Sequence, residues 1–216
     1  MASIQDIQDQ IALAAKRAGR KDLPTLIAVS KKHDADAIRP LLEAGHRDFG
    51  ESRVQEAQDK WPGLLEEYPD ARVHMIGQLQ SNKAADAMAL CASIHSLDRM
   101  SLLKSITKEA EKTGNCPDLF VQVNIGGEEQ KGGVAVDGLG DFLAKVRERE
   151  LPLKGLMCIP PADLEASPFF ALMAELARRH DVTGLSMGMS GDYEDAVMLG
   201  ATHLRIGSAI FGERPA

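Results

Sequence analysis

Short apolar runs alternate with amphipathic segments along most of the chain. The runs are rich in aliphatic and β-branched residues, which is typical of buried strands. The segments between them carry apolar residues at three- and four-residue steps, which is typical of helices that pack one face against a sheet. The pattern predicts strands over residues 26–30, 48–50, 73–77, 93–97, 119–124, 154–159, 184–188 and 203–206.

Strands that alternate with helices in this way predict an α/β fold with a parallel sheet, because each strand–helix–strand unit is a right-handed crossover. No linker or break in composition divides the chain. We therefore expect one domain, residues 1–216, folded as a (β/α)8 TIM barrel with an extra N-terminal helix over residues 4–17. A doubly wound open sheet is the alternative, but no G-x-G-x-x-G turn follows the first strand.

The composition of the chain limits the kinds of partner that the protein could bind. The 216 residues carry a formal net charge of −7 without a long basic run, which argues against nucleic acid and anionic membranes. No apolar stretch approaches the roughly 18–20 residues that span a bilayer, and the N-terminus lacks a secretory hydrophobic region. Three scattered cysteines and the lack of an HExxH motif suggest reduced thiols and no metal site. We expect a cytoplasmic protein and take it to be a monomer.

Polar and glycine residues gather at the carboxyl ends of the predicted strands, whose interiors we expect to stay apolar. In a barrel these ends line one mouth, where active sites form. Lys31 follows the first strand. A solvated lysine is the ordinary interpretation, but a lysine inside the rim loses water, which lowers its pKa and prepares the amine to form a Schiff base. Lys32 should then point away, because side chains alternate along a strand.

Two further features of the mouth suggest an anion site. Gly207 and Ser208 follow the last strand, and the loop before it supplies Ser190 beside a glycine. Loops at these places of a barrel often hold phosphate. Arg205, inside the last strand, needs either an acidic partner or a ligand. A lysine, a phosphate cradle and an arginine together describe a pyridoxal-phosphate (PLP) site.

Seven segments of the chain, in this order and spacing, resemble the pyridoxal-phosphate homeostasis protein family, which is related to the barrel domain of alanine racemase. The segments are AVSKKHDADAI, FGESRVQEAQDK, HMIGQLQSNK, VNIGGEEQKGG, GLMCI, LSMGMSGDYEDAV and ATHLRIGSAIFG. The resemblance covers nearly the whole chain. It implies a non-catalytic carrier that buffers PLP or delivers it to PLP-dependent client enzymes.

The resemblance also implies a role for each residue of the site. Lys31 would form the Schiff base, and Arg205 would face the pyridine nitrogen and keep it unprotonated. The phosphate would be held by Ser190, Gly207, Ser208 and the backbone near Met189. Ser208 replaces the usual threonine and retains its hydroxyl.

Three positions remain open at this point. Ser52 stands where the family has asparagine near the cofactor. His74 points either toward the cofactor or into the barrel core, where backbone partners would satisfy it. Lys131 is a second amine at the rim; it is either a solvated loop lysine or an acceptor of the cofactor from Lys31.

Two enzymatic alternatives compete with the carrier. A PLP-dependent racemase needs a second acid–base opposite the lysine, which in alanine racemases is a tyrosine from a further domain of the partner subunit. We expect no such domain in this protein, and Tyr68 and Tyr193 lie outside the predicted strand ends. A class I aldolase would use Lys31 directly on a sugar phosphate. We therefore expect no catalytic residue in the sense of substrate turnover.

Overall fold

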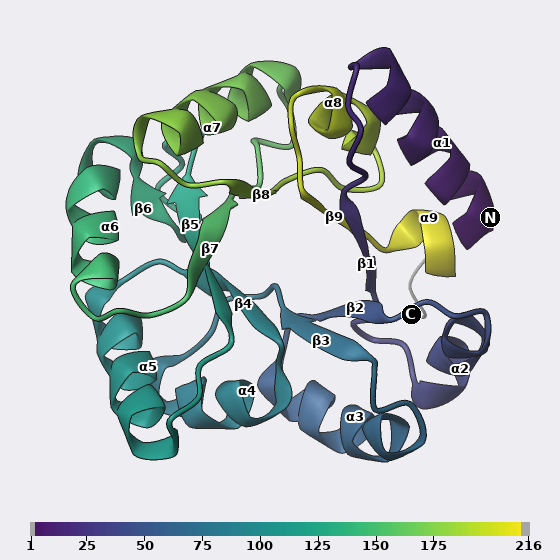
Figure 1. Ribbon diagram of the computed structural model, residues 1–216, viewed down its shortest axis with the longest axis horizontal. Coiled ribbons are helices and arrows are strands. Elements are labelled where there is room, and N and C mark those ends of the chain that lie inside the picture. The colour runs from purple at the N-terminus through teal and green to yellow at the C-terminus, as the bar shows by residue number, and fades with distance from the viewer. Residues whose placement is uncertain (1–2, 213–216) are drawn as a thin grey trace.

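The computed structural model describes residues 3–212, and a closed sheet of parallel strands forms its centre (Figure 1). Within these residues β1 pairs with β9 and β4 pairs with β5, so eight strands close into a barrel. The strands are β1 (Thr25–Val29), β2 (Asp48–Glu51), β3 (Arg72–Met75), β4 (Ser93–Leu97), β5 (Asp118–Asn124), β7 (Leu153–Met157), β8 (Gly184–Ser186) and β9 (His203–Ile206). The predicted (β/α)8 barrel is confirmed.

Helices form a ring outside the strands (Figure 1). They are α1 (Ile4–Arg17), α2 (Ala35–Glu43), α3 (Val54–Glu67), α4 (Ala84–Leu90), α5 (Met100–Thr113), α6 (Leu139–Arg147), α7 (Ser167–Arg179), α8 (Tyr193–Met198) and α9 (Ser208–Phe211). The extra helix α1 has the predicted bounds. It begins at a capping box between Ser3 and Asp6, buries Ile7 and Ile11, and packs beside α8.

Four of the eight strands, β1, β3, β7 and β8, end earlier at the mouth than the sequence pattern predicts. Ser30, Gly77 and Gly188 fall in the predicted strands, yet each lies in the loop that follows. Gly188 has a φ of +96°, which leaves the extended conformation, so the chain turns out of the sheet at this point. A two-residue strand, β6 (Val134–Ala135), was not predicted and pairs with the end of β5. The apolar pattern continues into the rim because rim residues are also buried.

The expectation that strand interiors stay apolar is wrong for the inward-facing positions. The layer between strands and helices is apolar, and Phe49 and Trp61 are fully buried there. The inside of the barrel instead holds buried polar side chains, of which His95 on β4 and Ser186 on β8 share a hydrogen bond across the interior. Alternation along each strand places one set of residues inside and the other outside.

Several predictions from composition can be compared with the structure. In residues 3–212 no helix is both long and apolar enough to cross a bilayer. No three His, Cys, Asp or Glu side chains of this part of the chain gather as metal ligands would. All three cysteines are free thiols. The predicted domain, residues 1–216, extends past the described residues at both ends.

Candidate functional site

A cavity of about 390 Å³ opens at the carboxyl ends of the strands. Seven of the eight residues predicted for the site line it, and they come from segments far apart in the sequence. They are Lys31, Ser52, Met189, Ser190, Arg205, Gly207 and Ser208. Two of these residues are cationic, and none of the described residues in the lining is Asp or Glu. The cavity therefore suits an anion.

The backbone after β1 turns Lys31 toward this cavity. Ser30 is fully buried, and its hydroxyl donates to Oε1 of Glu51 over 2.7 Å. Lys31 is half-buried in the cavity wall, whereas Lys32 is exposed and has a φ of +66°. The prediction that Lys31 and Lys32 face different ways is confirmed. The left-handed conformation at Lys32 turns the chain sharply after the cavity residue.

Helix α3 holds both ends of this turn. The Lys60 ammonium donates to the carbonyl of Ser30 over 2.9 Å and to that of His33 over 2.8 Å. The same nitrogen lies 2.7 Å from Oε1 of Glu51, and the Lys60 side chain is 6% exposed. The Glu56 carboxylate accepts the backbone N–H of Lys32. The loop that carries Lys31 is thus anchored by a buried ion pair beneath it.

The opposite wall is made by the turns after β8 and β9. The Ser190 hydroxyl accepts the backbone N–H of Ala209 over 3.4 Å, which joins the two turns. Gly207 precedes α9, and a Cβ there would lie 3.3 Å from the Cβ of Val29, so the turn packs closely on β1. The rings of His33 and Phe211 stack with centroids 4.7 Å apart and connect the first loop with α9.

Arg205 is buried without an acidic partner. Its Nη1 donates to the Ser186 hydroxyl over 2.7 Å, and its Nη2 donates to the carbonyl of Cys158 over 2.8 Å. No ion pair involves its guanidinium in the described part of the chain. Burial lowers the pKa of Arg205 from its ordinary value. The salt-bridge interpretation of this arginine fails, and the ligand interpretation remains.

His74 does not join the cavity, so its placement near the cofactor is corrected. Its ring lies 2.8 Å from Oδ1 of Asp48 and 2.6 Å from the hydroxyl of Ser93. Asp48 begins β2 and Ser93 begins β4, so His74 reaches toward the amino end of the barrel. The core interpretation holds, but side chains and not backbone groups satisfy the ring.

Of the two other rim residues that the sequence left open, Ser52 lies in the cavity wall and Lys131 does not. Ser52 lines the cavity, and Gly77 makes room for its loop, because a Cβ on Gly77 would lie 2.2 Å from the Ser52 carbonyl oxygen. Lys131 lies outside the lining. Its ammonium pairs with Glu128 over 2.6 Å and donates to the carbonyl of Pro160 over 3.0 Å.

The sequence interpretation missed several polar residues of the cavity, among them His33, Gln78 and Gln122. Gln122 interrupts an otherwise apolar strand, and this isolated polar residue was the signal that could have identified it. Gln78 follows the end of the third predicted strand. His33 comes two residues after Lys31, yet the loop conformation that brings it to the cavity has no local sequence signal.

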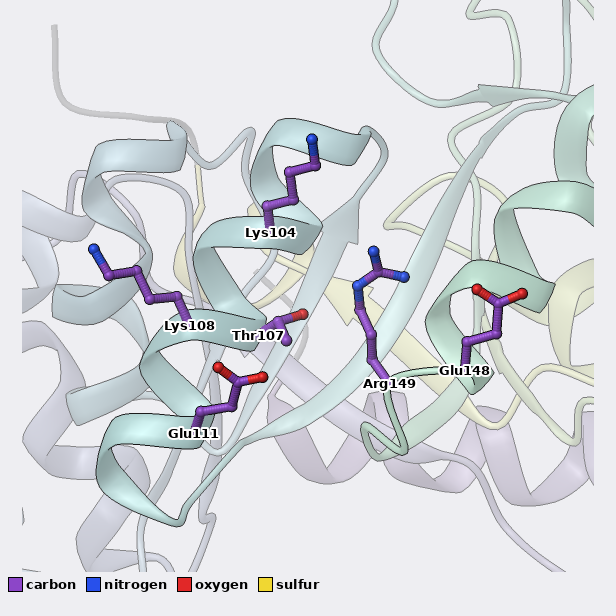
Figure 2. A pocket seen from close by; sticks show the side chains of 6 residues that line it. All are labelled: Lys104, Thr107, Lys108, Glu111, Glu148 and Arg149. Atoms are coloured by element: carbon purple, nitrogen blue, oxygen red, sulfur yellow. The ribbon is translucent and has the colours of Figure 1, made fainter.

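A second hollow, of about 480 Å³, lies on the outer surface and is a weaker candidate. Figure 2 shows its side chains on α5 and after α6, with the Lys108 ammonium group pointing away from the Arg149 guanidinium. Lys104, Lys108 and Glu111 are exposed. Because its charges face solvent and do not converge, this hollow has no built binding geometry.

The barrel and its mouth define a class of protein. The model of the family described as "Alanine racemase, N-terminal domain" matches residues 3–215, so the chain belongs to that class. An alanine racemase from Clostridium difficile shows the same fold, with a TM-score of 0.73 at 12% identity over 99% of this chain and 61% of the racemase.

More similar relatives define the family within this class. The chain is 39% identical over 219 residues to the pyridoxal phosphate homeostasis protein of Aquifex aeolicus, covering 96% of this chain and 95% of the relative. The protein of that name from Escherichia coli K12 is 34% identical, covering 98% and 95%. PipY of Synechococcus elongatus, solved with PLP bound, has a TM-score of 0.81 at 38% identity over 95% of this chain and all of PipY. The chain belongs to the pyridoxal phosphate homeostasis protein family.

Proposed function

We propose that this chain binds PLP in the mouth cavity, with the Lys31 amine bonded to the aldehyde carbon, and carries the cofactor without turning over a substrate. The observation that carries the proposal is the convergence of Lys31, Arg205 and the Gly/Ser turns on one cavity. The names of the relatives and the PLP bound to PipY support it. PLP-dependent client enzymes would receive the cofactor. The cytoplasmic location and the monomeric state stay predictions.

The chemistry of the cavity fits the group. PLP presents an aldehyde, a phosphate and an aromatic ring, and cavities for such ligands measure about 300–1,000 Å³. Lys31 supplies the amine, and Ser190 and Ser208 supply hydroxyl groups near the backbone amides of the Gly207 turn. When bound, PLP supplies an electrophilic carbon and a ring that can withdraw electrons.

Arg205 would limit how far such a ring can act as an electron sink. A guanidinium close to the ring nitrogen would disfavour a second positive charge there and would keep the nitrogen unprotonated. A neutral ring withdraws electrons less strongly than a pyridinium. This arrangement favours holding the cofactor over carbanion chemistry.

The composition of the lining also favours a carrier over a racemase. A racemase needs an acid–base group on the face opposite Lys31, and neither Tyr68 nor Tyr193 is among the described residues of the lining. The relatives are named homeostasis proteins, whereas the racemase shares only the fold with this chain.

The test combines absorbance with chemical trapping. The full chain mixed with PLP should show a visible absorption band, and borohydride followed by peptide mass mapping should locate the cofactor on Lys31. Lys31→Ala should lose both signals, whereas Lys32→Ala, its exposed neighbour, should keep them. A reduced adduct on Lys131, or an unchanged band in Lys31→Ala, would refute the assignment. A colourless protein that is trapped with a sugar phosphate would support the aldolase instead.

A further inference from the structure

A line of hydrogen-bonded side chains crosses the barrel from its amino end to the cavity. In order, this polar chain comprises Asp48, His74, Ser93, His95, Ser186 and Arg205. Its successive contacts measure 2.8, 2.6, 2.7, 2.8 and 2.7 Å. The members lie on β2, β3, β4, β8 and β9, and Figure 1 shows β4 and β8 on opposite sides of the barrel. The polar chain therefore forms only because the sheet closes into a barrel.

The two ends of the polar chain have opposite charge. Arg205, at the cavity, can only donate hydrogen bonds, and a carboxylate at Asp48 can only accept them. Burial raises the pKa of Asp48, but hydrogen bonds from His74 and from Arg72, whose Nη2 lies 2.6 Å from Oδ2, outweigh burial and lower it overall. Asp48 is thus ionised at neutral pH. Its hydrogen bond to His74 places a proton on Nε2 of that ring.

Between these two ends, all hydrogen bonds can be donated in one direction, from Arg205 toward Asp48. Burial lowers the pKa of His95 well below its ordinary value, so this ring is neutral and carries one N–H. If His95 donated to Ser186, the Ser186 hydroxyl hydrogen would have no acceptor, because within residues 3–212 its oxygen contacts only His95 and Arg205. The hydroxyl therefore donates to Nδ1 of His95, and Nε2–H of His95 donates to Ser93.

With this assignment every imidazole and hydroxyl in the line donates once and accepts once. All bond dipoles point the same way, with their negative ends toward Arg205, and hydrogen bonds aligned in series polarise one another. The His95 ring is also held in place by Phe120, on which it stacks at a centroid distance of 4.2 Å. Buried polar groups are costly unless satisfied, and this barrel satisfies each of them by the next one in line.

We propose that the polar chain positions the Arg205 guanidinium in the cavity and connects its charge to Asp48, which makes Ser186 and His95 positioning residues for PLP. The inference rests on the proposed function and adds to it the source of the arginine's orientation. Contacts at Nη1 and Nη2 fix the plane of the guanidinium at two points. Only the first of these belongs to a side chain, so Ser186 is the contact that a substitution can remove.

Ser186→Ala is the direct test, and Ser96→Ala is its matched control. Both serines are fully buried, but the Ser96 hydroxyl has no hydrogen-bond partner. Loss of a hydrogen bond to a charged group should raise the Kd for PLP about tenfold in Ser186→Ala. The substitution should also shift the pH at which the visible band of bound PLP has lost half of its absorbance. The reason is that the guanidinium no longer holds one orientation. Ser96→Ala should change neither quantity.

A measurement without PLP separates this inference from the proposed function. Nitrogen-15 spectra of labelled histidines in the full wild-type chain should show His95 as a neutral ring protonated at Nε2 and should show a proton on Nε2 of His74. Ser186→Ala should change the His95 signals, and Ser96→Ala should not. If the wild type binds no PLP while these spectra agree, the proposed function fails and the polar chain stands.

Asp48→Asn tests the far end of the chain and leaves the cavity lining intact. It should reduce PLP affinity about two- to threefold, since it removes the charge but keeps an acceptor for His74. It also decides the question should Ser186→Ala not fold. Tautomers other than Nε2–H, or unchanged PLP affinity and an unchanged pH midpoint in the folded variants, would overturn the inference.

Discussion

Removal of the Lys60 ammonium should destabilise the protein more than removal of any surface lysine. Lys60→Met keeps most of the length and apolar body of the side chain but leaves the fully buried Glu51 carboxylate without its cation. Two backbone carbonyls, of Ser30 and His33, lose a charged donor as well. Glu51 keeps two neutral donors, the hydroxyl of Ser30 at 2.7 Å and the indole N–H of Trp61 at 2.9 Å.

The expected magnitude follows from these contacts. Removal of one partner of a buried ion pair costs about 3–5 kcal/mol of the free energy of unfolding, mostly because the other charge is left buried. Glu51→Gln in the Lys60→Met background removes that charge while keeping an acceptor. The double variant should therefore recover about 1–3 kcal/mol relative to the sum of the single losses. Lys83→Met removes an ammonium that pairs with Asp86 at the surface, where both side chains are 38% exposed, and should stay within about 0.5 kcal/mol of wild type.

Urea unfolding is the appropriate assay for the wild type and the four variants, which are Lys60→Met, Glu51→Gln, the double variant of these two and Lys83→Met. Trp61 is the sole tryptophan of the chain and is fully buried, so its fluorescence reports on this region, and far-UV circular dichroism reports on the whole barrel. The folded Lys60→Met variant should also bind PLP more weakly, because the Lys31 loop loses its anchor. A loss below about 1 kcal/mol in Lys60→Met, or strictly additive losses in the double variant, would refute the reasoning.

Two further predictions concern packing and pH. Gly77→Ala should lose about 1–3 kcal/mol in urea unfolding and bind PLP more weakly, because its Cβ would lie 2.2 Å from the Ser52 carbonyl oxygen. Gly63→Ala in α3, where a Cβ meets nothing within 4 Å, should gain about 0.5–1 kcal/mol; equal effects at the two glycines would contradict this account. Burial lowers the pKa of His203 to about 4. The unfolded chain then binds the extra proton, so this contribution to stability is complete above pH 6.5 and is lost as the pH falls toward 4. In His203→Gln the urea midpoint should depend less on pH between these values. An unchanged dependence of the midpoint on pH would argue against this contribution of His203.

The sequence predicted the fold well because the relevant signals are local. Apolar runs and three- to four-residue periodicity identified the strands and helices, and the bounds of α1 agree at both ends. Parallel strands share one carboxyl edge, so polar residues after strands could be assigned to one mouth without knowing any distance. Lys31, Ser190 and Arg205 were found in this way and do line one cavity.

Closure of the barrel decided the rest. The sequence left His74 open between the cofactor and the core, because its direction along the barrel axis depends on Asp48 and Ser93 on nearby strands. Ser93 and His95 alternate with apolar residues, as they would on a strand with one face in water. Only the closed sheet turns that face inward, brings β4 opposite β8, and gives Ser93 and His95 their hydrogen-bond partners. The partner of a side chain is a property of three-dimensional distance, which local periodicity along a chain does not contain.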